Sequence, residues 1–300
     1  MSDAYLAVVN PAAGGGRCGK LAPTALDELR TAGFKLEVAQ LQRPGHGSEL
    51  AREGERRGFR KFLAVGGDGT AFEVLNGLFP RPADAPRPSL AFLPLGSGNS
   101  FLRDFSRDGL TYARQALKEG RERPCDVLRL THRGGALHFI NLLTFGFASD
   151  AAVLRDRKFR SFGTLGYWLA VLVCLARLER RPFPLRADGD AGLDRRRCLF
   201  LSFSNTKFTG GNMMIAPDAD PFDGLIEYVR WGPVGRVRLV ANLPGLYSGA
   251  HIRHPMAERR GVRQVEFALE APVDVMIDGE VATLHPERLE VLPGALMVAV

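Results

Sequence analysis

The sequence has little lysine, few cysteines and no long apolar run. Of its 40 basic residues only six are lysines, and we draw no function from that bias. The cysteines form no CxxC pair and no zinc-ligand spacing, which excludes a zinc finger or ribbon and predicts reduced thiols. The charge-free stretch at residues 165–176 is too short to cross a bilayer, which takes about 20 residues.

Two common nucleotide-binding signatures are also missing. The sequence contains no GxxxxGK[ST] pattern, which excludes a P-loop NTPase. The glycine-rich segment at residues 10–16 lacks the GxGxxG spacing with an acidic residue about 20 positions further on. A nucleotide that binds this chain therefore binds in another way.

Length and charge set broad limits. A chain of 300 residues with 45% apolar and 24% charged residues is typical of a globular protein of about two domains. The formal net charge of +7 favours anionic partners, and composition alone does not choose among nucleotides, free phosphates, nucleic acid and an acidic membrane.

The order of apolar runs and turns predicts two domains. In residues 1–125, short β-rich runs alternate with glycine-rich turns and helical spacing, a pattern typical of an α/β domain with a largely parallel sheet. In residues 126–300, most segments have the pattern of strands in an antiparallel domain, interrupted by a helix at 164–178. The final strand, at 295–300, suits either domain.

Three glycine-rich turns follow predicted strands, at residues 10–16, 66–70 and 96–99. Glycine lets backbone N–H groups approach a phosphate, and turns on successive strand ends converge at one edge of a parallel sheet. Asp68 is the charged side chain of the second turn. It either meets a phosphate-bound Mg²⁺, accepts a proton from an attacking hydroxyl, or caps the following helix.

Two acidic groups lie late in the chain. Asp218, Asp220 and Asp223 have carboxylate oxygens of the kind that a hard cation prefers as ligands. The alternative is that they form a solvated acidic turn. Asp278 and Glu280 flank a glycine between β-like runs, which is also the pattern of a simple hairpin turn.

The predicted helix at 164–178 has basic flanks. Residues 151–182 contain seven basic and two acidic side chains, a net charge of +5, and Arg160 is one of the basic residues. A basic-flanked apolar helix can rest on an anionic membrane. The alternative is a core helix that packs on the sheet of the second domain.

The order of these motifs resembles the catalytic domain of the diacylglycerol kinase family, which includes bacterial lipid kinases, sphingosine kinases and ceramide kinases. The resemblance rests on Asn10-Pro11 with the glycines after it, the GGDGT and EVLNGL elements at 66–70 and 73–78, LPLGSGN at 93–99, DPFDGL at 220–225 and DGE at 278–280. It covers most of the chain. GGDGT alone is shared with NAD kinases.

The resemblance implies a Rossmann-like N-terminal domain, a C-terminal antiparallel β-sandwich, and ATP- and Mg²⁺-dependent phosphorylation of a lipid hydroxyl. It implies that ATP is bound by residues of the three turns: Asn10, Pro11, Gly14, Gly15, Gly16, Gly66, Gly67, Asp68, Gly69, Thr70, Ser97 and Asn99. By similarity, Glu280 is the first candidate for the proton acceptor, with Asp278 and Asp68 as alternatives. The implied Mg²⁺ ligands are Asp223 through its side chain and Asp220 and Leu225 through main-chain oxygens.

Two departures concern the lipid acceptor. Ser100 follows Asn99 where the diacylglycerol-type bacterial enzymes usually have aspartate, and Asp104 comes one helical turn later. Asp150 lies in the segment where sphingosine kinases place a head-group aspartate, and a carboxylate suits an amino-alcohol cation; alternatively it begins a helix or faces solvent. Both diacylglycerol and sphingosine- or ceramide-type acceptors therefore stay open.

We expect a cytoplasmic protein with peripheral membrane contact through residues 155–181, a lipid substrate and no nucleic-acid partner. Two alternatives stay open at this point. One is an NAD kinase-like phosphotransferase, and the other is a catalytically silent module that binds a nucleotide or a lipid.

Overall fold

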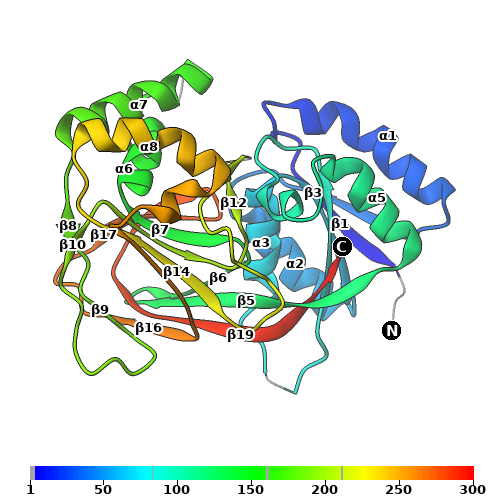
Figure 1. The fold of residues 1–300 in the computed structure, drawn as a ribbon. Coiled ribbons are helices and arrows are strands. Elements are labelled where there is room, and N and C mark those ends of the chain that lie inside the picture. Colours follow the sequence, from blue (N-terminus) through cyan, green and yellow to red (C-terminus); the bar gives the residue numbers. More distant parts are fainter. Residues whose placement is uncertain (1–3, 83, 160–161, 211) are drawn as a thin grey trace. The chain divides into compact units, whose positions relative to one another are not determined.

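The structure, a computed structural model, describes residues 4–82, 84–159, 162–210 and 212–300. Arg160 of the predicted basic flank lies outside the described residues. The chain divides into two compact units (Figure 1). Unit 1 comprises Met1–Val127, His138–Ile140 and Pro293–Val300, and unit 2 comprises Leu128–Leu137 and Asn141–Leu292.

Unit 1 contains a sheet whose strand order is β2-β1-β3-β4-β19. All neighbours along this path pair in parallel, including the last residues of β19 with β4. The elements that lie entirely in unit 1 are β1 (Tyr5–Val9), α1 (Arg17–Thr31), β2 (Leu36–Gln40), α2 (His46–Arg56), β3 (Lys61–Gly66), α3 (Asp68–Leu78), β4 (Ser89–Pro94), α4 (Ser100–Arg103) and α5 (Gly109–Glu119). Strands that run through both units are β5 (Glu122–His132), β6 (Gly135–Phe139) and β19 (Pro286–Ala299).

The central strands of unit 1 are apolar on both faces. All five residues of β1 are buried, and so are five of the six residues of β3 and of β4. Continuous burial is typical of parallel strands with helices on both sides. The parallel α/β fold predicted for the N-terminal part is confirmed.

Helix α2 begins at His46, so Ser48 lies inside its first turn. The Ser48 hydroxyl donates a hydrogen bond to the main-chain oxygen of Glu73 at 2.7 Å. The Glu73 carboxylate accepts the N–H groups of Gly45 at 2.9 Å and Gly47 at 2.7 Å. A side chain of α3 therefore satisfies the N-terminal donors of α2.

Unit 2 is built on an antiparallel sheet with the order β15-β14-β11-β7-β17-β18. A second layer pairs β16 with both β19 and β9, also antiparallel. The remaining elements of unit 2 are β7 (Leu142–Gly146), α6 (Phe147–Leu154), the π-helix η1 (Arg155–Phe159), α7 (Gly163–Arg177), β8 (Arg181–Pro182), β9 (Leu185–Ala187), β10 (Arg197–Cys198), β11 (Phe200–Ser204), β12 (Phe208–Thr209), β13 (Met213–Met214), β14 (Ile226–Trp231), α8 (Arg236–Ser248), the 3₁₀ helix η3 (Ala250–Arg253), β15 (Ala257–Val262), β16 (Gln264–Phe267), β17 (Val273–Ile277) and β18 (Glu280–Leu284).

Aromatic side chains join the two layers of unit 2. Phe145 of β7 and Phe203 of β11 both contact Phe267 of β16, with ring centroids 5.3 and 5.6 Å apart. A second apolar cluster includes Phe200 and Trp231 of the large sheet and Leu239 of α8. The predicted antiparallel β-sandwich is confirmed. Among the described residues, no helix has the length and apolarity needed to cross a membrane.

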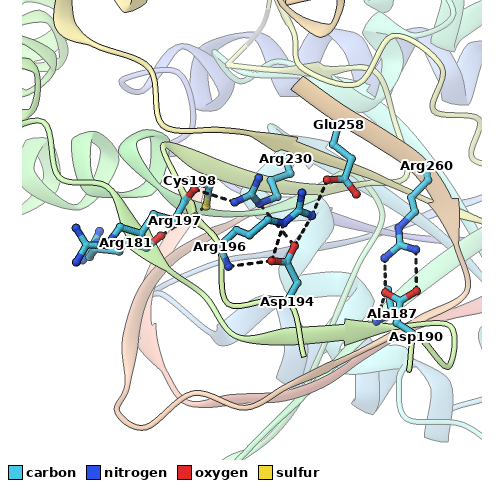
Figure 2. Close-up of polar contacts among 10 residues, drawn as sticks. All are labelled: Arg181, Ala187, Asp190, Asp194, Arg196, Arg197, Cys198, Arg230, Glu258 and Arg260. Carbon is cyan, nitrogen blue, oxygen red and sulfur yellow. Dashed lines mark hydrogen bonds and ion pairs between the residues drawn. The ribbon is translucent and has the colours of Figure 1, made fainter. Parts of the chain in front are cut away.

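Charged side chains on one side of unit 2 form a network (Figure 2). Arg230 of β14 is nearly buried, with 7% of its side chain exposed, and lies 3.8 Å from the Asp194 carboxylate. Its Nη2 donates to the main-chain oxygen of Arg197 at 2.8 Å. Arg196 bridges Asp194 at 2.6 Å and Glu258 of β15 at 2.7 Å (Figure 2). These contacts fix the loop that precedes β10.

Asp194→Asn lowers the free energy of unfolding by about 3 kcal/mol at neutral pH, because it leaves the buried Arg230 charge without its partner. Hydrogen bonds from Arg196 hold the pKa of Asp194 below its ordinary value. This stabilisation is therefore complete above the unfolded carboxyl pKa, about 3.9, and is lost as the pH falls towards the lower folded-state pKa. Urea titrations of both proteins at pH 7 and at about pH 3 measure the difference, which narrows at the acid end. An equal difference at both pH values would contradict this assignment.

Candidate functional site

The glycine-rich turns of unit 1 lie at one edge of its parallel sheet. β1, β3 and β4 are adjacent and parallel, so the turns after them leave the sheet at the same edge. The Gly96 N–H donates to the Gly66 oxygen at 2.7 Å, and Arg17 Nη2 donates to the Gly96 oxygen at 3.1 Å. The Asn99 side chain also donates to the Gly96 oxygen, at 3.0 Å. Direct contacts therefore bring the three predicted turns together.

The turns pack so closely that side chains are excluded. A Cβ atom on Gly96 would lie 2.5 Å from the Gly67 Cα and 2.6 Å from its nitrogen. One on Gly66 would lie 2.2 Å from the Thr70 hydroxyl, and that hydroxyl is buried without a hydrogen-bond partner in the described part of the chain. The backbone of these turns thus faces its neighbours directly.

The turn before α1 is suited to an anion. Gly14, Gly15 and Gly16 all have positive φ angles, a conformation that glycine adopts without strain. Gly16 precedes α1, whose first turn has no side-chain cap and no acidic residue. The N–H groups of Gly16, Arg17 and Cys18 donate to main-chain oxygens of the turn itself. The positive end of the helix dipole favours an anion at this helix start. Asn10 and Pro11 begin this turn, and Ser97 is exposed in the turn after β4.

Asp68 caps a helix, but not the one that the sequence indicates. It lies in the first turn of α3, and both of its carboxylate oxygens accept the N–H of Ser100 at the start of α4, at 2.8 and 2.9 Å. Burial raises the pKa of this carboxyl, and the Ser100 hydrogen bonds oppose that shift. Asp68 also lies within contact distance of where a Gly98 side chain would begin. Its position therefore fixes the turn that contains Ser97 and Asn99.

Asp68→Ala should destabilise the protein more than Asp68→Asn, because an amide oxygen still accepts the Ser100 N–H while alanine leaves that donor unpaired. An unpaired buried donor costs about 1–3 kcal/mol. Thermal unfolding of the two variants measures the order. Equal stability of the two variants would contradict this capping role.

In unit 2, Asp278 and Glu280 have different environments. The two-residue turn between β17 and β18 consists of Asp278 and Gly279, with φ angles of 48° and 88°, which is the pattern of a type I′ hairpin. The buried Asp278 Oδ1 accepts the N–H groups of Asn141 and Leu142, both at 3.0 Å. Glu280 begins β18 with an exposed side chain. Asp278 thus holds the turn, and Glu280 is presented at the surface of unit 2.

The acidic loop before β14 uses its carboxylates locally. Asp220 accepts the N–H of Phe222 at 3.1 Å, and Asp223 accepts that of Leu225 at 2.9 Å. Partial burial raises the pKa of Asp223, and the neighbouring Asp220 charge adds to the effect. Asp218 instead pairs with Arg259. No group of three or more His, Cys, Asp or Glu side chains among the described residues is placed to hold a metal ion.

The carboxylate of Asp223 and the main-chain oxygens around it nevertheless match the ligand chemistry of a hard cation. A cation would also relieve the repulsion between Asp220 and Asp223. The residues present therefore fit one Mg²⁺ held by a single carboxylate and carbonyl oxygens, and do not fit a cluster of carboxylates.

Asp150 is engaged by an arginine. It lies in the first turn of α6, and both of its carboxylate oxygens accept from Arg181 Nη2. Burial raises the pKa of Asp150, and the Arg181 charge acts in the opposite direction. A cationic head group would compete with Arg181 for this carboxylate.

Sequence reasoning gave no structural role to Glu73 or Asn76. Glu73 fixes the start of α2, as described above. Asn76 donates from Nδ2 to the His138 oxygen at 2.8 Å and accepts the His138 N–H at 2.9 Å. The polar side chains of the EVLNGL segment, at helical spacing beside buried Val74 and Leu75, were the available signal.

Comparisons with known proteins match both parts of the chain. Residues 141–300 match the family described as "YegS C-terminal NAD kinase beta sandwich-like domain", and residues 4–130 match "Diacylglycerol kinase catalytic domain". The chain belongs to the diacylglycerol kinase and YegS-like lipid kinase family. The resemblance deduced from the motifs is therefore confirmed, and the protein is a lipid kinase.

Individual relatives span nearly the whole chain. A diacylglycerol kinase of Mycobacterium tuberculosis is 28% identical over 97% of this chain and 93% of its own length. A probable lipid kinase YegS-like of Chromohalobacter salexigens is 29% identical over 92% of this chain and 87% of its own length. The crystal structure of a diacylglycerol kinase from Bacillus anthracis has the same fold, with a TM-score of 0.76 at 23% identity, covering 99% of this chain and 96% of that one.

Proposed function

We propose that this lipid kinase transfers the γ-phosphoryl group of ATP, with Mg²⁺, to the hydroxyl of a neutral membrane lipid such as diacylglycerol. The observation that carries the proposal is the convergence of the three glycine-rich turns beside the start of α1, which has no side-chain cap and no acidic residue in its first turn. Backbone N–H groups and a helix N-terminus are the recurring means of binding phosphates.

The reaction requires little covalent chemistry from the protein. The oxygen of the lipid hydroxyl attacks the γ-phosphorus, the bond to the β-phosphate oxygen breaks, ADP leaves, and the hydroxyl proton passes to a base. We assign that base to Glu280, the first candidate from the family resemblance, because its side chain is exposed whereas Asp278 is buried. Asp278 then acts as a positioning residue for the turn.

Mg²⁺ bound with the nucleotide would neutralise phosphate charge. A second, structural Mg²⁺ would be held by Asp223 with the main-chain oxygens of Asp220 and Leu225. Peripheral contact with a membrane would involve residues 155–181.

The pairing of Asp150 with Arg181 favours a neutral acceptor over an amino alcohol. The Arg181 guanidinium, which also lies 3.8 Å from Glu179, competes with an ammonium group for the Asp150 carboxylate. Diacylglycerol and ceramide have no such group, whereas sphingosine does.

The test is an assay with γ-labelled ATP, Mg²⁺ and mixed micelles that contain diacylglycerol, ceramide or sphingosine separately, with NAD in a micelle-free control. We expect labelled lipid from diacylglycerol. Label from sphingosine alone would contradict the neutral-acceptor assignment, and label only in NAD would contradict the lipid-kinase proposal. Nucleotide binding without transfer to any acceptor would favour a catalytically silent module.

A further inference from the structure

Exposed apolar side chains concentrate on two helices of unit 2. Of the ten large apolar side chains that the described residues expose, six lie on α7 and α8: Leu165, Trp168, Leu172, Val237, Val240 and Tyr247. We call these six residues the two-helix surface. Scattered exposed apolar residues are normal, but a concentration of this kind marks an interaction site.

Helix α8 carries apolar side chains on its exposed face as well as on its packed face. Its Leu239, Leu243 and Leu246 belong to or pack against the apolar cluster that contains Trp231 of the sheet. Val237, at 84% exposed, Val240 at 48% and Tyr247 at 51% lie on the other side. Pro244 continues that exposed side, so the face that would ordinarily be polar is apolar as well.

The two helices lie side by side in unit 2 (Figure 1). Arg236 at the start of α8 donates to the oxygens of Leu175 and Ala176 near the end of α7, at 3.1 and 2.7 Å. Tyr247 near the end of α8 lies close enough to Tyr167 in the first half of α7 to add to the rise in the Tyr167 pKa that burial causes. The helices are therefore antiparallel neighbours. Leu175 of α7 packs against the same cluster as the leucines of α8, which places the end of α7 beside α8.

The charges around this surface are mostly positive, and the exposed Glu179 beyond the end of α7 lies 3.8 Å from Arg181. Neither α7 nor α8 contains an aspartate or glutamate. Arg177, Arg180, Arg236 and Arg238 lie at the helix ends, and within the described ranges none of them forms an ion pair. Arg180 and Arg236 donate to main-chain oxygens instead.

We propose that α7 and α8 together form a membrane-docking surface for an anionic bilayer, in which the exposed face of α8 is as necessary as that of α7. The proposal deepens the proposed function, since a lipid kinase must reach an acceptor held in a membrane. Apolar side chains enter the boundary between head groups and acyl chains, and arginines attract anionic lipids at about 1 kcal/mol each. Trp168 and Tyr247 are the side-chain types that favour the membrane interface. A second copy of this face would bring like charges together.

The two tryptophans supply a direct readout. Trp168 is 52% exposed, whereas Trp231 is completely buried. The protein with 100 nm vesicles of phosphatidylcholine and about 30% phosphatidylglycerol should show a blue shift in emission, and brominated lipid should quench it. Pure phosphatidylcholine vesicles should bind much more weakly.

The decisive variant removes the apolar face of α8 alone: Val237→Ser, Val240→Ser and Tyr247→Ser together. We expect co-sedimentation with the anionic vesicles to weaken at least about tenfold. The matched control carries Leu21→Ser, Leu193→Ser and Met256→Ser, which are exposed apolar residues outside the two-helix surface. The control should bind as the parent does, and thermal unfolding verifies that both variants fold.

Vesicle binding by the α8 variant equal to that of the parent would overturn the proposal. So would a parent that ignores vesicles and dimerises through this face, seen as a loss of the dimer in the α8 variant on size-exclusion chromatography. Activity on a monomeric short-chain diacylglycerol distinguishes a loss of docking from a loss of catalysis. An α8 variant that phosphorylates this dissolved substrate normally, but no longer phosphorylates diacylglycerol held in vesicles, supports docking. A parent that binds anionic vesicles but phosphorylates no lipid also supports docking, while contradicting the proposed function.

Discussion

Glu280→Gln lowers kcat for phosphoryl transfer by about 10²–10⁴-fold and leaves the dissociation constant for ATP nearly unchanged. Glutamine keeps the size and polarity of the side chain but does not accept the proton of the lipid hydroxyl. The base acts mainly in the transition state, so ground-state nucleotide binding is spared. Steady-state kinetics with mixed micelles and calorimetric titration with a nonhydrolysable ATP analogue measure the two quantities.

Glu287→Gln is the matched control, since Glu287 is also exposed and lies on the strand that follows β18. It should retain the parent kcat. A near-normal kcat for Glu280→Gln would remove Glu280 from the catalytic role. In that case Asp278 and Asp68 would be the candidates, and their hydrogen bonds to main-chain N–H groups would have to be exchanged during turnover.

Gly96→Ala should lower the free energy of unfolding by about 1–3 kcal/mol and weaken ATP binding at least tenfold. A Cβ atom at this position meets the Gly67 backbone at 2.5 Å, so the turns after β3 and β4 have to separate. The hydrogen bond from the Gly96 N–H to the Gly66 oxygen would be strained by the same movement. Thermal unfolding and titration with ATP test both effects.

Gly192→Ala controls for the loss of a glycine, because nothing lies within 4 Å of a Cβ built there. It should leave both quantities unchanged. Normal ATP affinity in a folded Gly96→Ala protein would show that the close approach of these turns is not required for nucleotide binding.

Much of the fold could be predicted from local patterns. A few neighbouring residues are enough to predict the apolar strands β1, β3 and β4 and the glycine-rich turns after them. The same holds for the strands of the sandwich. Helix starts were less accurate, because α2 is capped by Glu73, which lies 28 residues from Gly45 in the sequence. A partner at that separation leaves no local signal.

The same contrast between local patterns and partners distant in the sequence applies to the candidate site. The turns that meet in unit 1 were evident from their glycines, but the partner of Asp68 is Ser100, 32 residues away. Asp150 illustrates the limit most clearly. Its sequence context suits a carboxylate that binds a cationic substrate, whereas Arg181, 31 residues away, already occupies both of its oxygens.

The last strand has a consequence for how the protein is made. Met297 and Val298 of β19 pair in parallel with Ser89 and Leu90 of β4, and the side chains from Leu296 to Val300 include several that are fully buried. During synthesis, the parallel sheet of unit 1 therefore keeps an open β4 edge until β19 has left the ribosome. An open edge is where another nascent chain can add a strand. Pairing of β19 with β4 thus protects the sheet against misassembly. Unit 1 is complete only after β19 has been synthesised.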